Sequence, residues 1–249
     1  MFEEPTRRHV PKTMESSKFE FRRASYLDYP AVLPDLEYEM ADYLPYFPCF
    51  VGSMTLSRIL TLTDHFRETS RVNGHIADVE IFRGASSFLF AKLLEIYEPN
   101  SLSRAHGFDW FQGNQPSSGA GSVIPGGGIE DEYRLRELAR LQGLEHVLHI
   151  RSIDLVSQIQ NFFDRFERLR FRLIFMDAGM HEVVRSALPY FWDHLNPGVP
   201  ISFDQYNFDA APGETRAVNE FFASKDVEFL TIQGSWMPTM HVQKGGLAS

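Results

Sequence analysis

Residues 74–86, with the sequence GHIADVEIFRGAS, decide the fold class of this chain. The apolar run His75–Phe82 predicts a buried strand, and Gly84 opens a turn that leads into an apolar helix at Phe88–Tyr97. A turn that opens with glycine lets the backbone approach a ligand closely, and the helix that follows directs its first N–H groups at that ligand. The stretch therefore predicts a strand, a tight turn and a helix, with a ligand site at the turn.

The rest of the chain repeats this alternation of strands and helices. Such alternation is typical of an α/β protein with a mostly parallel sheet and helices on both faces. We expect a seven-stranded sheet whose last two strands form an antiparallel hairpin at the C-terminus. The expected strands are 75–82, 105–109, 147–150, 172–177, 200–204, 227–232 and 241–244, and the expected helices are 56–66, 88–97, 130–142, 155–166, 181–195 and 212–223.

Composition divides the chain into an N-terminal segment, 1–54, and a main domain, 55–249. Residues 1–24 are polar and contain two prolines, which is typical of a mobile arm or simply of disorder. Residues 25–50 are rich in Tyr and Pro, and this stretch either caps a pocket or packs on the outside of the core. Residues 113–128 contain six glycines and two prolines, so we expect a loop there.

The bulk composition fits a soluble enzyme. The chain has 249 residues, of which 43% are hydrophobic, enough for one large α/β domain. Its net charge of −9 argues against nucleic acid as a partner, because phosphate binding needs a basic face. The single cysteine, Cys49, excludes an intrachain disulfide and a cysteine-based zinc cluster. No apolar run reaches the roughly 20 residues of a membrane helix, and the N-terminus lacks the apolar core of a secretory signal. We therefore expect a cytoplasmic protein.

Acidic residues stand where four of the expected strands end. Asp78 lies near the end of the first, and Asp109, Asp177 and Asp204 end or follow three others. Ligands of open α/β sheets bind at the carboxyl ends of the strands. An acid after the second strand can accept two hydrogen bonds from a ribose diol, and two acids on adjacent strand ends can hold a hard divalent cation. Each acid alone could be a helix cap, but capping does not require acids at four strand ends.

Three segments carry a resemblance to a known family. Residues 74–86 align without gaps on the pattern G-D-x-x-E-C-G-V-[FW]-[RK]-G-[GA]-S, and residues 107–113, GFDWFQG, align on [GL]-F-D-[ST]-F-E-G. FDQYN at 203–207 and PGETRAV at 212–218 align on D-[DE]-Y and P-G-x-x-x-A-V. Over about residues 55 to 244 the chain resembles the macrocin O-methyltransferase-like enzymes, which include the mycinamicin and novobiocin sugar O-methyltransferases.

The resemblance implies a Rossmann-like class I methyltransferase fold with S-adenosylmethionine as the methyl donor. It places Asp109 at the ribose hydroxyls of the donor, with other contacts along the methionine part and on both sides of the adenine. It also implies a magnesium or calcium ion at Asp177, Asp204 and Gln205. The implied donor-binding residues are Asp78, Glu80, Phe82, Arg83, Gly84, Ser86, Asp109, Trp110, Phe111, Ser152, Ile153 and Asp177.

The sequence departs from the family pattern at three positions. Glu80 stands where the family has glycine, so a carboxyl group either crowds the donor or changes what is bound. Gln205 replaces a metal-binding carboxylate and, as a neutral ligand, weakens the expected cation site. Gly179 replaces the aspartate assigned as the general base. The base is then expected to be His181, with Asp177 as the second catalytic residue, and a packed histidine at a helix start is the alternative for His181.

The expected function is methylation of a hydroxyl on a sugar, a nucleotide-sugar or a glycosylated natural product. The expected partners are this small molecule and further copies of the chain in a homodimer or larger homo-oligomer. One alternative is a binding protein that kept the fold and lost the chemistry, which the three departures favour. A nicotinamide-dependent oxidoreductase is a weaker alternative, because G-x-G-x-x-G and a Tyr-x-x-x-Lys pair are both missing.

Overall fold

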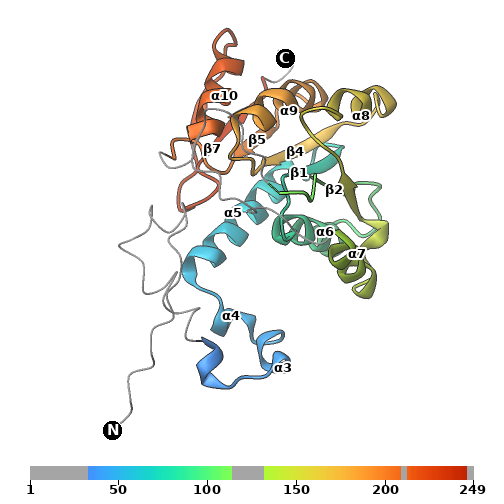
Figure 1. Ribbon diagram of the computed structural model, residues 1–249, viewed down its shortest axis with the longest axis vertical. Helices are drawn as coiled ribbons and strands as arrows, with labels where there is room; N and C mark the ends of the chain where they lie inside the picture. The colour runs from blue at the N-terminus through green and yellow to red at the C-terminus, as the bar shows by residue number, and fades with distance from the viewer. Residues whose placement is uncertain (1–32, 114–131, 209–211, 246–249) are drawn as a thin grey trace. The chain divides into compact units, whose positions relative to one another are not determined.

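The computed structural model describes residues 33–113, 132–208 and 212–245 (Figure 1). The predicted polar arm 1–24 and most of the predicted glycine-rich loop, from residue 114, lie outside the described residues. The chain forms two compact units, Met1–Leu60 and Thr61–Ser249. Among the described helices, none has the length and apolar character needed to span a membrane.

The first unit contains short helices and an aromatic cluster. Its described elements are η3 Leu33–Leu36, α3 Met40–Tyr43, α4 Phe47–Phe50 and the beginning of α5 Ser53–Thr69. The ring of Phe50 lies 4.9 Å from that of Tyr38 and 4.6 Å from that of Tyr43, measured between centroids. Part of the Tyr-rich segment 25–50 therefore packs on itself.

The second unit is built on a seven-stranded sheet with the strand order β3-β2-β1-β4-β5-β7-β6. The first five strands are parallel, and β7 runs antiparallel to both β5 and β6. The predicted mostly parallel sheet with a C-terminal antiparallel hairpin is thus confirmed. The strands are β1 His75–Val79, β2 Ala105–Asp109, β3 Leu148–Ser152, β4 Phe171–Met176, β5 Pro200–Phe203, β6 Phe229–Thr231 and β7 Met240–Gln243.

Helices cover both faces of this sheet. Apolar residues of α8, α9 and α10 form one buried cluster against the strands, and residues of α6, α7 and the second half of α5 form another. The predicted helices on both faces are therefore confirmed. The remaining elements are α6 Ala85–Tyr97, α7 Glu132–Leu141, η4 Leu144–His146, α8 Ile159–Arg165, α9 His181–His194 and α10 Pro212–Phe222.

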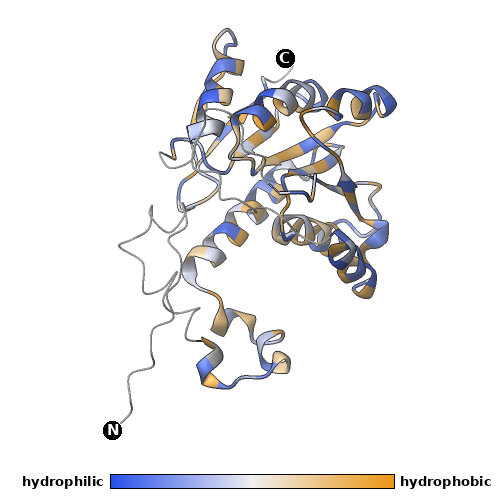
Figure 2. Ribbon diagram, viewed as in Figure 1, coloured by the Kyte–Doolittle hydropathy of each residue, from blue (hydrophilic) through white to orange (hydrophobic). Residues whose placement is uncertain are grey.

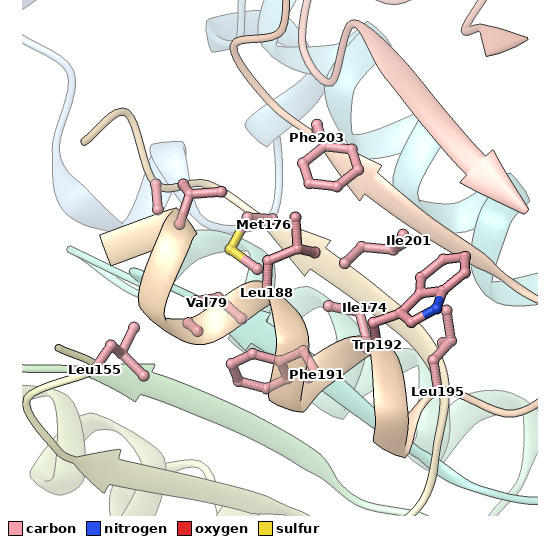
Figure 3. Close-up of a cluster of buried hydrophobic side chains, with 14 of the residues drawn as sticks. Val79, Leu155, Ile174, Met176, Leu188, Phe191, Trp192, Leu195, Ile201 and Phe203 are labelled. Atoms are coloured by element: carbon pink, nitrogen blue, oxygen red, sulfur yellow. The ribbon is translucent and has the colours of Figure 1, made fainter. Parts of the chain in front are cut away.

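The core on the α9 face is dense and largely aliphatic and aromatic. Figure 3 shows Ile174 of β4 with Leu188 and Phe191 of α9, and Phe203 of β5 beside them. Each of these side chains is fully buried, and burial of one such side chain stabilises the fold by about 1.5–3 kcal/mol. In Figure 2 the central strands are largely hydrophobic (orange), whereas the helices carry both hydrophobic and hydrophilic residues.

One difference from the predicted elements concerns β1. The predicted strand continues to Phe82, whereas the observed strand stops at Val79. Glu80 and Phe82 have φ angles of 66° and 47°, a left-handed conformation that an extended strand does not contain. The apolar run therefore predicted burial correctly, but its last residues form the turn that precedes α6.

Three histidines form a row across β1, β2 and β3. The ring of His106 lies 5.0 Å from that of His75 and 5.1 Å from that of His149. Burial and the neighbouring guanidinium groups of Arg104 and Arg151 favour the neutral imidazoles. They lower the pKa of His106 to about 2 and that of His149 to about 4, and the pKa of His75 is also lowered.

This row predicts that the fold loses stability in mild acid. In the unfolded chain a histidine takes up a proton near pH 6.5, whereas His106 in the folded chain stays neutral at that pH. Proton uptake therefore favours the unfolded chain, and the free energy of unfolding falls as the pH drops below about 6.5. One such group changes the free energy of unfolding by about 1.4 kcal/mol per pH unit. Urea denaturation between pH 7.5 and 4.5 should show a shallower pH dependence for His106→Gln. The exposed His146→Gln is the control, and equal slopes for the two variants would contradict the account.

Candidate active site

The carboxyl ends of four parallel strands meet along one edge of the sheet. Val79 of β1 lies opposite Phe108 of β2 and Met176 of β4, and Met176 lies opposite Phe203 of β5. The residues at and just after these positions, Glu80, Asp109, Asp177 and Asp204, therefore lie side by side. We call this row the carboxyl rim. The structure thus brings together three of the four predicted strand-end acids, Asp109, Asp177 and Asp204, and adds Glu80 to their row.

Asp78, the fourth predicted acid, lies one layer deeper. It is fully buried within β1, and its Oδ2 accepts hydrogen bonds from Ser86 Oγ (2.8 Å) and Ser87 Oγ (2.5 Å). These bonds tie β1 to the first turn of α6. Gly84, the N-cap of that helix, has a φ of 77°, which suits glycine in the predicted tight turn. Asp78 and Ser86 hold the turn, which directs the helix N-terminus toward the rim.

Asp109 joins the two loops that follow β1 and β2. Its Oδ2 accepts a hydrogen bond from the backbone N–H of Phe82 (2.8 Å), and its Oδ1 accepts one from that of Phe111 (2.7 Å). Both phenylalanines have left-handed φ angles, 47° and 59°. Non-glycine residues in this region cost free energy and persist where the surroundings hold them. The buried carboxylate of Asp109 is what holds these two loops together.

The other predicted donor-binding residues flank this pair of loops. Arg83 stacks its guanidinium over the exposed ring of Phe82, with 5.1 Å from Cζ to the ring centroid. Ile153 donates its N–H to the carbonyl of Asp109 at 2.8 Å, which brings the end of β3 beside the end of β2. Ser152, the last residue of β3, is exposed, and Trp110 is partly exposed. These residues all lie at the same edge of the sheet as Asp109.

The carboxyl groups of the rim repel one another. Burial, followed by repulsion from Asp109, Asp177 and Asp154, raises the pKa of Glu80 to about 8. Burial also raises the pKa of Asp109, although the N–H bonds from Phe111 and Phe82 act in the opposite direction. The rim therefore presents an acidic surface on which the ionisation of one carboxyl group disfavours that of its neighbours.

Two glycines shape the corner where β4, β5 and α10 meet. A Cβ atom at Gly179 would lie 2.6 Å from Gln205 Oε1, so the Gln205 amide occupies the space that a side chain at 179 would need. A Cβ atom at Gly213 would lie 2.5 Å from the carbonyl oxygen of Gly179 and 2.6 Å from the N atom of His181. The first turn of α10 is therefore in close backbone contact with the loop that follows β4.

Glu214 is a site residue that sequence reasoning did not place. It is fully buried in the first turn of α10, and its Oε1 accepts the N–H of Gln205 at 2.7 Å. Burial, together with the charge of Asp204, raises its pKa well above the usual value. An acid in the first turn of a helix is ordinarily explained by the helix dipole. The structure shows in addition that Glu214 holds the backbone just after β5, through its hydrogen bond from Gln205.

The residues mapped onto a metal site supply two carboxylates and one neutral amide oxygen. In the described part of the chain, no three His, Cys, Asp or Glu side chains are arranged to hold a metal ion. Gln205 directs its buried Oε1 toward Gly179, and that oxygen is neutral. Magnesium and calcium prefer several charged oxygen ligands. The predicted site at Asp177, Asp204 and Gln205 therefore gains no support from the geometry.

His181, the predicted base, is paired with a residue of α10. Its Nε2 lies 2.8 Å from Glu220 Oε2, and Glu220 also accepts a hydrogen bond from Arg216. These two contacts lower the pKa of the Glu220 carboxyl group. The imidazole, nearly buried at the start of α9, thus links α9 to α10.

The two glycine contacts predict unequal effects of alanine. Gly213→Ala should lower the free energy of unfolding by about 1–3 kcal/mol, because the new methyl group meets backbone atoms that cannot move freely. Gly179→Ala should cost less, since the Gln205 side chain can move, and adding Gln205→Ala should restore most of the loss. Urea denaturation of these variants measures the differences. A loss at Gly179→Ala that Gln205→Ala does not reduce would contradict the assigned contact.

Comparison with solved structures shows the same fold in known enzymes. Calicheamicin methyltransferase CalS11 is similar with a TM-score of 0.77 and 18% identity, over 94% of each chain. Its apo structure, described as a TDP-rhamnose 3'-O-methyltransferase, gives 0.70 and 18%, over 96% of this chain and 99% of that one. The O-methyltransferase NovP gives 0.58 and 17%, over 79% and 81%. The predicted Rossmann-like class I methyltransferase fold is confirmed.

Sequence comparisons add the family. A search of curated protein sequences found no significant match. A model of the methyltransferase domain family matches residues 79–206, more than half of the chain, from the end of β1 to just beyond β5. The matched segment contains the whole carboxyl rim. The chain therefore belongs to the methyltransferase domain family.

Proposed function

We propose that this protein is an S-adenosylmethionine-dependent O-methyltransferase that acts on a hydroxyl of a sugar, a nucleotide-sugar or a glycosylated natural product. The observation that carries the proposal is the position of Asp109 and its two loops inside the segment matched by the methyltransferase family. The fold likeness to CalS11, described as a TDP-rhamnose 3'-O-methyltransferase, supports a sugar as the acceptor, and the likeness to NovP supports O-methylation. The family match does not favour the alternatives of a binding protein without chemistry and an oxidoreductase.

Each part of the donor has a candidate partner on the carboxyl rim or in the loops beside it. The carboxylate of Asp109 keeps lone pairs beyond its two backbone bonds and can accept the ribose hydroxyls. Trp110, which is partly exposed after β2, and Ser152, which is exposed at the end of β3, are candidate contacts for the adenine, with Phe111 and Ile153 buried beside them. The turn at Gly84, held by Asp78 and Ser86, offers helix N–H groups to the methionine carboxylate.

Methyl transfer requires alignment and the removal of one proton. The acceptor oxygen attacks the methyl carbon, the C–S bond breaks with its electron pair left on sulfur, and the hydroxyl proton passes to a base. Alignment of the two reactants supplies much of the acceleration in such reactions. We assign the base to Asp177, which is partly exposed at the end of β4 and has its N–H bonded to Val79 at 3.0 Å. His181 then has a positioning role through its bond to Glu220.

Two variants decide between Asp177 and His181 as the general base. Asp177→Asn should lower kcat about 100-fold or more, as loss of a general base does. His181→Ala should lower kcat less than about 10-fold and should instead lower thermal stability, because it removes a link between α9 and α10. Initial-rate kinetics at saturating donor, with thermal unfolding in parallel, measure both effects. The opposite ranking of the two kcat values would move the base to His181.

The function itself is tested by mass spectrometry. The protein is incubated with S-adenosylmethionine and a panel of nucleotide-sugars and glycosides, and we expect one acceptor class to gain the mass of one CH₂ group. The panel should include free sugars as a further acceptor class, and the same mixture without the protein is the control. Binding of the donor without any methylated product would favour the binding-protein alternative. Light scattering on the same sample tests the proposed homodimer or larger homo-oligomer.

A further inference from the structure

Glu80 occupies a central position on the carboxyl rim. It follows β1, which lies between β2 and β4 in the sheet, so Asp109 flanks it on one side and Asp177 on the other. Its backbone N–H is bonded to the carbonyl oxygen of Phe108 at 2.8 Å, and its φ of 66° is left-handed. A residue without a side chain would adopt this conformation more easily. The chain therefore keeps a carboxyl group here despite a backbone cost.

The charges around Glu80 define the kind of ligand that suits it. Asp109, Asp177 and Asp154 act on it with negative charge, and their repulsion adds to the effect of burial in raising the pKa of Glu80. A ligand that places a positive charge among these groups would relieve the repulsion and stabilise the ionised carboxylate. A neutral ligand of the same shape would gain nothing from it.

We propose that Glu80 makes the donor site selective for the cationic sulfonium of S-adenosylmethionine over the neutral thioether of S-adenosylhomocysteine. This inference rests on the proposed function, because the donor and its product differ at this centre by one methyl group and one positive charge. The ligands share the adenosine and amino-acid parts, which Asp109 and the Gly84 turn would hold equally in both. A charged group near the sulfur can distinguish them, and Glu80 holds the central position of the rim between Asp109 and Asp177.

The selectivity has a direction in the catalytic cycle. During transfer the methyl group leaves sulfur, the positive charge there disappears, and the attraction from Glu80 is lost. Glu80 therefore strengthens the binding of the donor and weakens the retention of the product. An interaction that is stronger in the ground state than in the transition state lowers KM without raising kcat. Loss of the carboxylate should accordingly raise KM for the donor and leave kcat unchanged or higher.

Three ligands test this by calorimetry. They are S-adenosylmethionine, S-adenosylhomocysteine, and an unreactive analogue that carries an ammonium group near the sulfonium position. The wild type should bind both cations about 10-fold more tightly than the thioether, a ratio that corresponds to one favourable charge interaction. Glu80→Gln should reduce this ratio several-fold, to what Asp109, Asp177 and Asp154 alone supply, while binding the thioether as before. Asp164→Asn, which removes an exposed carboxylate of α8, is the matched control and should keep the wild-type ratio.

Other outcomes overturn the proposal in distinguishable ways. If Glu80→Gln keeps the wild-type ratio, or weakens all three ligands equally, Glu80 does not select by charge, although the donor site stands. If the wild type binds none of the three ligands, the proposed function fails as well. Glu80→Gly separates the loss of the carboxyl group from any loss of stability, because glycine adopts the left-handed conformation at position 80 without strain. It should lower the ratio as Glu80→Gln does while folding at least as stably as the wild type, and an unchanged ratio would also overturn the proposal.

Discussion

The candidate site depends on one buried carboxylate, that of Asp109. Its two oxygens accept backbone N–H groups from Phe82 and Phe111, which lie in different loops and both adopt left-handed conformations. Hydrogen bonds to an ionised carboxylate are stronger than neutral ones, so this single residue can offset the cost of both conformations. The loops that follow β1 and β2 are thereby fixed beside each other, and the order of the parallel strands then places Glu80 and Asp177 next to them.

At the other end of the rim, where β4, β5 and α10 meet, the residues at positions 179 and 205 fit each other sterically. Gly179 leaves space that the Gln205 amide fills, and Gly213 lets α10 approach the same loop closely. Glu214 is buried beneath this corner, where it holds the N–H of Gln205. The departures from the family pattern at 179 and 205 are therefore sterically coupled. They remove charge from this corner and leave Asp177 as the partly exposed carboxylate that can take a proton.

The sequence predicted much of this and missed parts for physical reasons. Alternating apolar segments predicted the parallel sheet, the hairpin and the strand-end positions of Asp109, Asp177 and Asp204, because periodicity reports burial directly. It could not show that β1 stops at Val79, since a left-handed turn and a strand can have the same apolar residues. Nor could it give the orientation of His181 or Glu214, because both depend on how α9 and α10 pack together.

The central claim, that Asp109 organises the donor site, is tested most directly by titrating S-adenosylmethionine into the wild type and Asp109→Ala in a calorimeter. Removal of the carboxylate frees two backbone N–H groups and would remove the proposed ribose contact, and each lost bond costs about 1 kcal/mol. The account predicts that the donor binds the variant at least 10-fold more weakly while circular dichroism still shows a folded sheet. An unchanged Kd in the folded variant would contradict it.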